Sequence, residues 1–367
     1  MEKSFLMSFM LTIAVAFAIS AAPSSKTSAS GAADDKARKV AAERGLTLLA
    51  QKVNDGTLTH PSGDTGCCVV YSTAGLAFLA EGSTLSAGKY KGELEKCYKY
   101  IQTTLEKCSD SVMGDQWDQS MWAYSHALIF LTELHAGAPD ETKAEIFKLA
   151  QTAADVLVKA QTPEGGWCHG AKNIKNALGY TSFVGVSNFC LIALGCSSKI
   201  KAKVPAATID NGIKYIENSS SDGQVGYSPR EGQKGFGQAG RNAGSVLAFM
   251  ACKKSGNKNF RKMVSFMEDN MSEIPKGHGS AQMHVMLTDW ATYVLGTKNW
   301  TAFWKMHGKG ILALQKEDGN FDVEIGDEAA KMGGAVGSAV EGGDRALATH
   351  VFILLIPQSK FKNLTFK

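Results

Sequence analysis

The 367-residue sequence lacks segments with the alternation or the density of β-branched residues that β-strands require. Almost every long segment instead has helical periodicity, with apolar residues three and four positions apart. This absence excludes a fold built on a sheet. We therefore expect an all-α protein.

An excess of charge of one sign is also lacking, since 39 basic residues are balanced by 35 acidic residues and the formal net charge is +4. Such a balance gives no indication of a nucleic-acid partner. After residue 22, no apolar segment is long and uninterrupted enough to cross a bilayer. We therefore expect no stable membrane span in the processed chain.

The N-terminus has the pattern of a secretory signal peptide. Lys3 precedes an apolar run from Phe5 to Ile19, and small residues follow the run. This pattern predicts a signal peptide at residues 1–22 and a secreted or periplasmic protein. The alternative is an uncleaved anchor, although the run is shorter than the ~20 residues that span a bilayer.

The remaining chain is predicted to contain one domain. Residues 23–35 are rich in Ser, Ala and Gly, and this composition predicts a disordered leader. Repetition along residues 36–367 favours a single domain, which we expect to be monomeric.

The eight cysteines do not have the spacing of a small disulfide scaffold. Cys97 and Cys108 are eleven residues apart, so they share one face of a predicted helix. We expect most cysteines to be small core residues. Disulfides remain possible in an exported chain, but spacing does not reveal which cysteines would pair.

Two kinds of helical segment alternate six times along the chain. Segments of the first kind are amphipathic, with one charged face typical of an outer layer: Lys36–Asn54, Ala87–Lys107, Pro139–Ala160, Ala206–Glu217, Asn257–Asn270 and Trp300–Gln315. Segments of the second kind are small and apolar on nearly all sides, so other helices must cover them: Cys67–Ala80, Trp117–Leu134, Ser182–Gly195, Arg241–Lys253, Ser280–Leu295 and Asp344–Ile356.

Glycine-rich turns connect the outer segments to the inner ones. One turn has the sequence QTPEGGW at residues 161–167, and a degenerate copy, QKEDGNF, occurs at residues 315–321. Glycine permits the left-handed conformation that ends a helix, and the aromatic residue after it can fill the gap between neighbouring hairpins. The recurrence predicts a repeat of helical hairpins.

These turns resemble the repeat motif of the α/α toroid superfamily, which includes terpenoid cyclases, protein prenyltransferase β subunits and complement-type thioester domains. Gln161, Gly165 and Trp167 match the cyclase motif in full. The resemblance covers about residues 36–357 and implies an α/α toroid of about six outer–inner hairpins around a central cavity. In cyclases these turns stiffen the structure and take no part in catalysis.

The catalytic motifs of these relatives are absent. Neither the DxDD of hopene-type cyclases nor the DDxxD of class I terpene synthases occurs. Asp64 lies three residues before Cys67, whereas prenyltransferases have a DxC motif, and the GCGEQ of thioester domains is missing. These absences argue against squalene or terpene cyclisation.

A weaker local similarity connects the chain to lanthionine cyclase-like proteins, which are also toroids and bind zinc. Cys168 lies in the sequence WCHG, which is similar to their WCxG motif, and His278 matches the His of their CHG motif. Gly277 replaces the second Cys ligand. The resemblance therefore implies a zinc site only if His169 or His284 supplies the third ligand.

The inner segments carry candidates for acid–base chemistry and binding. Asp118, Trp122 and His126 are spaced four residues apart, so they share one stripe of a helix. A carboxylate, an aromatic plane and an imidazole facing a cavity suit carbohydrate binding or proton transfer. The alternative is that they are ordinary cap and core residues.

Other inner segments place similar groups near the same end. His278 and His284 lie at the start of the fifth inner segment, Arg241 opens the fourth, and Asp344 opens the sixth. We expect Asp118, His284 and His278 to be catalytic. Arg241, Trp122, Asp344 and His126 are expected to bind substrate, with Arg241 contacting an anionic group.

The sequence therefore predicts an exported toroid with a polar central cavity, acting as a hydrolase or lyase on a carbohydrate or another polar polymer. Two alternatives remain open. One is a toroid that binds a glycan or peptide without catalysis, and the other is a zinc enzyme of the lanthionine cyclase type. No other cofactor is expected.

Overall fold

The computed structural model describes residues 29–110, 119–170, 182–234, 239–275, 280–323 and 342–366. Helices make up most of these residues, which confirms the all-α prediction. The sequence did not predict one small feature, an antiparallel pair of two-residue strands, β1 (Ser220–Ser221) and β2 (Gln224–Val225). No helix of this described part is long and apolar enough to cross a membrane.

Six amphipathic helices form an outer layer. Most of their ends lie within a few residues of the positions that periodicity predicted. They are α1 (Ala29–Asp55), α3 (Lys91–Asp110), α5 (Asp140–Lys159), α7 (Ala206–Asn218), α9 (Lys258–Asp269) and α11 (Thr297–Ala313). In α5, the buried residues lie three and four positions apart while the charged residues face solvent. Helix α1 begins within residues 23–35, the segment for which composition predicted disorder.

Six further helices form an inner layer, again close to the predicted segments. They are α2 (Gly63–Glu81), α4 (Ser120–Ala136), α6 (Val184–Ser197), α8 (Ala239–Ala251), α10 (Ala281–Leu295) and α14 (Arg345–Leu355). In α4, every residue from Ser120 to Leu134 is buried. Short 3₁₀ helices follow three of the twelve: η1 (Ser198–Ile200), η2 (Met271–Glu273) and η3 (Ile356–Gln358).

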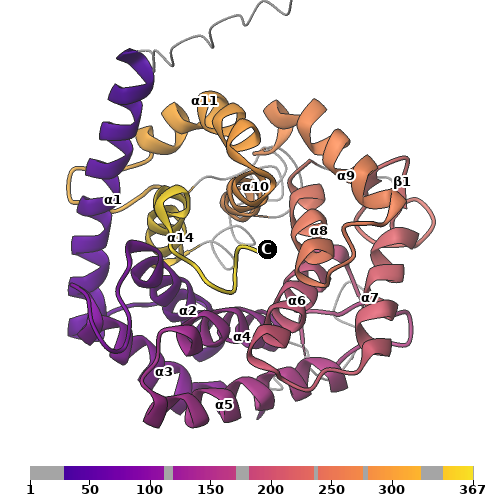
Figure 1. Cartoon of the computed structure of the whole chain (residues 1–367), viewed down its shortest axis with the longest axis horizontal. Coiled ribbons are helices and arrows are strands. Elements are labelled where there is room, and N and C mark those ends of the chain that lie inside the picture. The colour runs from indigo at the N-terminus through magenta and orange to yellow at the C-terminus, as the bar shows by residue number, and fades with distance from the viewer. Residues whose placement is uncertain are drawn as a thin grey trace, which may run out of the picture.

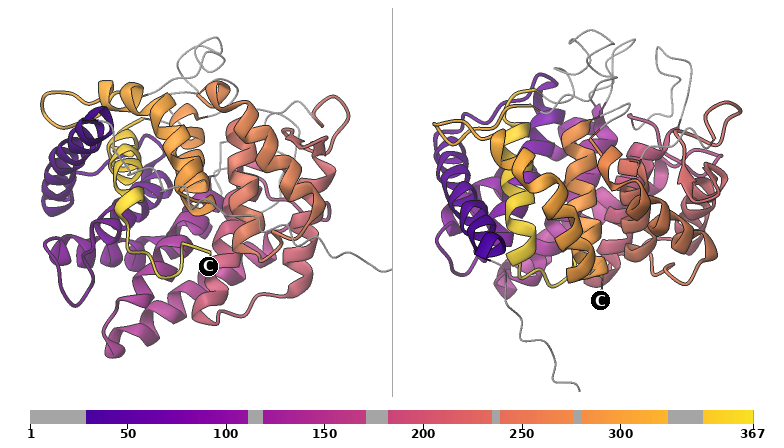
Figure 2. Two further views of the ribbon diagram at one scale, coloured as in Figure 1. Left: turned by 45° about the horizontal axis from the view of Figure 1, so that its top comes forward. Right: turned by 90° about the horizontal axis from the view of Figure 1, so that it is seen from above.

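The inner helices form a closed ring. Each packs against the next one along the chain, and α14 packs against α2 again. Figure 1 shows this inner ring with the outer helices around it, and Figure 2 shows the inner helices running roughly side by side. A ring of this kind covers the apolar faces of its inner helices on all sides.

Long-range contacts place the starts of the inner helices at one end of the ring. Val184, at the start of α6, donates its amide to the carbonyl of Tyr227 before α8 (2.8 Å). Asp344, before α14, donates its amide to the carbonyl of Thr59 before α2 (3.0 Å). The positive dipole ends of these helices therefore lie at this end.

The C-terminal segment closes the other end. Glu133, near the end of α4, accepts hydrogen bonds from the backbone amides of Lys362 (2.7 Å), Asn363 (2.8 Å) and Leu364 (3.2 Å). The indole of Trp290 donates to the carbonyl of Leu364 (3.1 Å). In Figure 1 the C-terminus accordingly lies in the middle of the ring.

The two glutamine turns occupy equivalent positions, as their sequences predicted. Gln161 donates to the carbonyl of Gly165 (2.8 Å) in its own turn and to that of Thr208 (2.9 Å) on α7, the next outer helix. Gln315 makes the same pair of bonds, to Gly319 (3.3 Å) and to Ala41 (2.8 Å) on α1. The degenerate copy therefore joins the last outer helix to the first.

The glycines of these turns are required by their conformation. Gly165 has φ +94°, and Gly319 has φ +92°. A Cβ on Gly165 would lie 2.5 Å from the carbonyl oxygen of Asn211, and a Cβ on Gly319 would lie 2.9 Å from that of Arg44. Any other residue would be strained and would separate the neighbouring hairpins.

Candidate functional site

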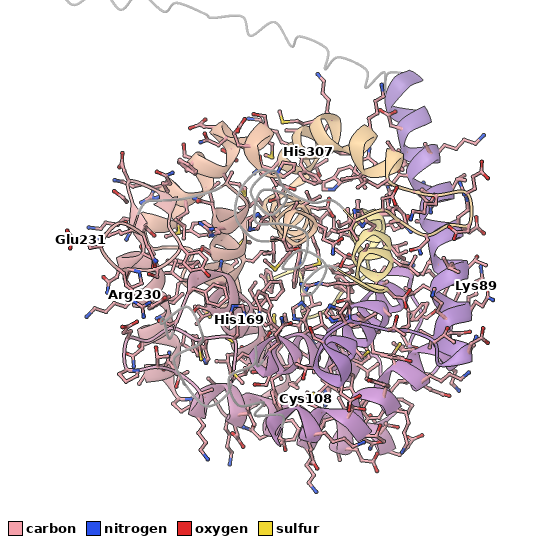
Figure 3. All side chains as sticks on the ribbon, turned by 180° about the vertical axis from the view of Figure 1, so that it is seen from behind. Lys89, Cys108, His169, Arg230, Glu231 and His307 are labelled. Carbon is pink, nitrogen blue, oxygen red and sulfur yellow. The ribbon has the colours of Figure 1, made fainter. Side chains whose placement is uncertain are left out.

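The first turn of α4 pairs with the loop that follows the QTPEGGW turn. The indole nitrogen of Trp122 donates to Nδ1 of His169 (2.9 Å), and the amide of Met121 donates to the carbonyl of His169 (3.0 Å). Figure 3 shows His169 inside the outer layer, toward the middle of the ring, whereas Arg230 lies nearer the rim. The predicted residues Trp122 and His169 are thus in direct contact.

Further rings extend this contact into a row, which we call the aromatic row. His126 stacks on Phe189 of α6 with ring centroids 4.4 Å apart. His169 lies 4.4 Å from Phe183, and Phe183 stacks on Tyr227 at 5.3 Å. The aromatic row therefore runs from α4 across the start of α6 to the segment before α8.

Arg241 lies at the end of the aromatic row. Its guanidinium carbon lies 5.1 Å from the centroid of the Tyr227 ring, within the range of a cation–π interaction. The residue is only 3% exposed, and its carbonyl accepts a hydrogen bond from the side chain of Asn188 (3.2 Å). A buried guanidinium at the start of an inner helix suits the recognition of an anion.

His284 lies beside Arg241. A Cβ built on Gly240, the residue before Arg241, would collide with Cβ and Cγ of His284, so the imidazole packs directly on the backbone of α8. The structure thus brings Trp122 and His126 into the aromatic row and places His284 against Gly240, the residue before Arg241.

The histidines of the aromatic row are neutral near pH 7. Burial and, secondarily, the charge of Arg345 lower the pKa of His126 to about 3. Burial alone lowers the pKa of His169 to about 3. His126 donates from Nδ1 to the carbonyl of Trp122 (2.8 Å), while Nδ1 of His169 accepts from the indole, which places the proton of His169 on Nε2.

Two predicted catalytic residues, Asp118 and His278, lie outside the described residues. The third, His284, lies in the first turn of α10, where the side chain of Ser280 caps the helix by accepting from the amide of Met283 (3.0 Å). Of the three predicted catalytic residues, the structure therefore describes His284 alone.

Two of the predicted zinc ligands, Cys168 and His169, make hydrogen bonds to protein groups. The thiol of Cys168 donates to the carbonyl of Gly170 (2.9 Å), and Nδ1 of His169 is bonded to Trp122. The remaining predicted zinc ligand, His278, lies outside the described residues. Within the ranges that the structure describes, no three His, Cys, Asp or Glu side chains are grouped as a metal site.

Asp344 makes contacts of a different kind. Its carboxylate accepts from the amide (2.8 Å) and the hydroxyl (3.3 Å) of Thr59 and lies 3.0 Å from the ammonium of Lys52. These bonds join the start of α14 to α1 and to the segment before α2. The contacts of Asp344 in the described structure are thus with protein groups, and its role in substrate binding stays a prediction.

Several residues of the site were not predicted. Phe183, Phe189 and Tyr227 are apolar or aromatic residues of inner segments or connections, where the sequence alone indicates only core packing. A partial signal was present for Tyr227, because it follows the Asp222–Gly223 turn. Its pairing with Arg241, fourteen residues later, depends on the fold.

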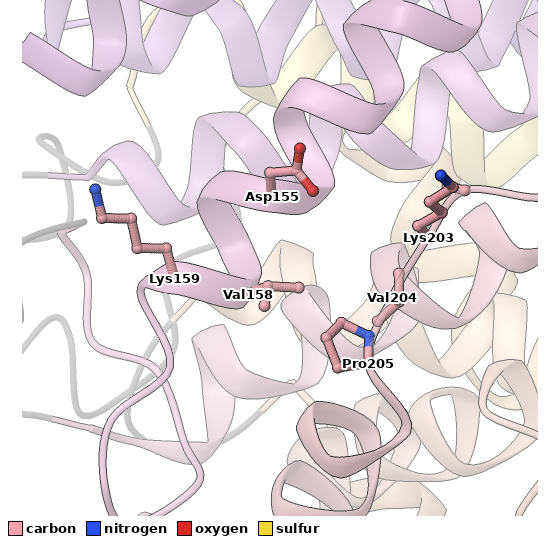
Figure 4. A pocket seen from close by; sticks show the side chains of 7 residues that line it. Asp155, Val158, Lys159, Lys203, Val204 and Pro205 are labelled. Atoms are coloured by element: carbon pink, nitrogen blue, oxygen red, sulfur yellow. The ribbon is translucent and has the colours of Figure 1, made fainter.

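A surface pocket of about 600 Å³ lies elsewhere, between α5 and the segment before α7 (Figure 4). Two of its polar groups are bonded to Gln151, which donates to Asp155 (2.8 Å) and accepts from the amide of Lys203 (2.7 Å). It is lined by Asp155, Val158, Lys159, Ala202, Lys203, Val204 and Pro205. None of the predicted site residues contributes to it.

A family model described as "Domain of unknown function (DUF6288)" matches residues 43–351. The match begins within α1 and ends within α14, so it includes the aromatic row, Arg241 and His284. No curated protein matches the sequence.

Proposed function

Because the chain belongs to the DUF6288 family, whose description assigns no function, we propose a function from the site itself. The ring is an α/α toroid, and the starts of its inner helices bind a carbohydrate or another polar polymer that carries anionic groups. The protein cleaves this substrate as a hydrolase or lyase. We further propose that it acts as a monomer outside the cytoplasm after removal of residues 1–22.

One observation carries the proposal, the aromatic row that ends at Arg241. Flat rings such as Trp122 and Tyr227 offer apolar faces beside polar edges, which suits a sugar ring with its C–H faces and hydroxyl edges. Arg241 adds a permanent positive charge with several donors, which suits a carboxylate or sulfate.

The neutral histidines support the same class of ligand. His126 donates from Nδ1 to Trp122, so its Nε2 is an acceptor, while Nε2 of His169 is a donor. A hydroxyl group can both donate and accept. The neutral acceptor of His126 therefore matches hydroxyl-rich ligands better than a second charged group would.

Catalysis is assigned to His284 together with Asp118 and His278. A histidine packed on Gly240, the residue before Arg241, can remove the proton next to a uronate carboxylate that Arg241 binds, which is the step that a lyase requires. A carboxylate such as Asp118 can act in glycosidic hydrolysis. This part of the proposal rests on residue types and on the contact between His284 and Gly240.

A second candidate is binding of a glycan without catalysis. It is favoured by the low pKa of His126 and His169, because groups that stay neutral from pH 5 upward exchange no proton near pH 7. In this case the site contributes recognition alone.

The test begins with binding of neutral and uronate-containing oligosaccharides to the purified chain. Arg241→Met should weaken binding of uronate oligosaccharides at least tenfold, because it removes the charge and keeps a long side chain. Arg261→Met, an exposed position on α9, is the matched control and should leave affinity unchanged. Equal binding by wild type and Arg241→Met would overturn the proposal.

A second measurement separates cleavage from binding. New reducing ends report hydrolysis or elimination, and ultraviolet absorbance of an unsaturated product reports elimination alone. His284→Gln should abolish product formation while binding stays within a few-fold of wild type. If the wild type binds and forms no product, the non-catalytic candidate is the correct one.

A further inference from the structure

Two cysteine thiols from different helices are in contact. Sγ of Cys68, in the second turn of α2, lies 3.6 Å from Sγ of Cys108, in the last turn of α3. Both side chains are buried, and all eight cysteines are present as thiols.

We propose that Cys68 and Cys108 form a disulfide bond when the chain folds under oxidising conditions. The S–S bond forms as the two thiols lose two protons and two electrons to a disulfide of the glutathione or oxidoreductase type, which is reduced to two thiols. The bond requires only a small displacement of the two helices, because the sulfur atoms are 3.6 Å apart and an S–S bond is about 2.05 Å long. The inference does not depend on the proposed function.

The surroundings favour the pair over the neighbouring thiols. Cys67 contacts the carbonyl of Leu58 (3.9 Å) before α2 and the side chain of Tyr100, which lies two turns before Cys108 on α3. Cys97 shares a face of α3 with Cys108 but has no sulfur contact among the described residues. The contacts of Cys67 and Cys97 therefore make them less suitable partners for a disulfide than Cys68 and Cys108.

Burial also determines when the bond can form. Hydrogen bonding to Cys108 and burial hold the pKa of Cys68 well above its usual range, so the folded thiol is scarcely ionised at neutral pH. Thiol–disulfide exchange requires the thiolate. Oxidation is therefore expected during folding, and a bond once formed is shielded from reductants by the same burial.

The position of the bond gives it a structural consequence. It would join the end of α3 to α2 forty residues earlier, directly before the connection that leads to α4 and Trp122. A cross-link that closes a loop of this length strongly lowers the conformational entropy of the unfolded chain. The end of α3 would thereby be attached to α2 at a fixed point.

The test compares the full chain produced in an oxidising and in a reducing compartment. Each preparation is alkylated, digested without reductant and analysed by mass spectrometry. We expect Cys108 linked to the peptide that contains Cys67 and Cys68 in the oxidised preparation alone. Because both cysteines are in one peptide, Cys67→Ser is the matched control and should keep the link, whereas Cys68→Ser should lose it.

Thermal unfolding provides a second measurement. The oxidised wild type and Cys67→Ser should unfold roughly 5 °C or more above their reduced forms, and Cys108→Ala should show no such difference. Circular dichroism establishes that each variant is folded. Alkylation of both Cys68 and Cys108 in the oxidised preparation, or a Cys67–Cys108 link, would overturn the proposal.

Discussion

The side-chain amide of Gln315 donates to the backbone carbonyl of Ala41 at 2.8 Å, across 274 residues of sequence. This bond connects the end of α11 to α1 and so helps to close the outer layer. Gln161 makes the corresponding bond to Thr208, 47 residues later. One local motif therefore links each of these turns to whichever outer helix comes next around the ring.

Gln315→Ala should lower the free energy of unfolding by about 1–2 kcal/mol, because the carbonyls of Ala41 and Gly319 lose a donor. Gln161→Ala should have an effect of similar size. Gln102→Ala, on the surface of α3, should cost about 0.5 kcal/mol or less. Urea denaturation measures all three, and a neutral Gln315→Ala would contradict a role in closing the ring.

Trp122→Phe should destabilise the protein by about 1–3 kcal/mol, since Nδ1 of His169 loses its hydrogen-bond donor. The phenyl ring keeps most of the packing on Phe189. Trp304→Phe is the matched control, because no hydrogen bond of its indole is present in the described part of the structure. Similar losses for both variants in chemical denaturation would show that packing alone accounts for the effect.

Stability should fall as the pH is lowered below about 6.5. The pKa of His126 and of His169 is lowered from about 6.5 to about 3 on folding, so the unfolded chain binds more protons than the folded chain between these values. Each histidine then contributes a loss of about 1.4 kcal/mol per pH unit through that window, and none above it. The measurement is urea unfolding from pH 7.5 to 4.5, and His126→Gln should reduce the slope by about one proton. An unchanged slope in that variant would contradict the low pKa.

Gly240→Ala should lower stability by about 1–3 kcal/mol and displace His284, because the new methyl group would occupy the position of the imidazole. Gly310→Ala is the control, since a Cβ there meets no atom within 4 Å. That variant, in an exposed part of α11, should raise stability by about 0.5–1 kcal/mol. Thermal unfolding compares them, and equal effects would mean that His284 does not pack on α8.

Glu133→Gln should release the C-terminal segment. The carboxylate accepts from three consecutive backbone amides, and an amide group cannot replace all three bonds. We expect a loss of about 2 kcal/mol and much faster removal of the last residues by a carboxypeptidase. Glu145→Gln, exposed on α5, should digest at the wild-type rate. Resistance of the Glu133→Gln variant would mean that Trp290 and packing alone hold the segment.

The positions of the helices were largely predictable from sequence, because the signals are local. Helical periodicity placed both ends of α7 and α10 to within one residue, and the glycine turns marked where hairpins reverse. The exception is the start of α1, since a Ser-, Ala- and Gly-rich segment has weak periodicity. The β1–β2 pair was missed because strands of two residues have no measurable alternation.

The candidate site was predictable only in part. Trp122, His126, Arg241 and His284 were selected because polar and aromatic groups are conspicuous on otherwise apolar helices, and their roles in binding or catalysis stay predictions. Asp344 was assigned to a ligand on the same grounds, yet its carboxylate bonds to Thr59, 285 residues earlier. A local pattern cannot distinguish a ligand contact from an internal one.

The sequence by itself determined the helical class, the alternation of outer and inner helices and the equivalence of the two glutamine turns. These features depend on interactions within a few turns of the chain, where spacing and residue type are sufficient. Only the tertiary structure decided three contacts: the hydrogen bond from Trp122 to His169, the cation–π contact of Arg241 with Tyr227 and the sulfur–sulfur contact of Cys68 with Cys108. Each of these pairs joins different elements of the fold, and the packing of neighbouring hairpins selects the partners.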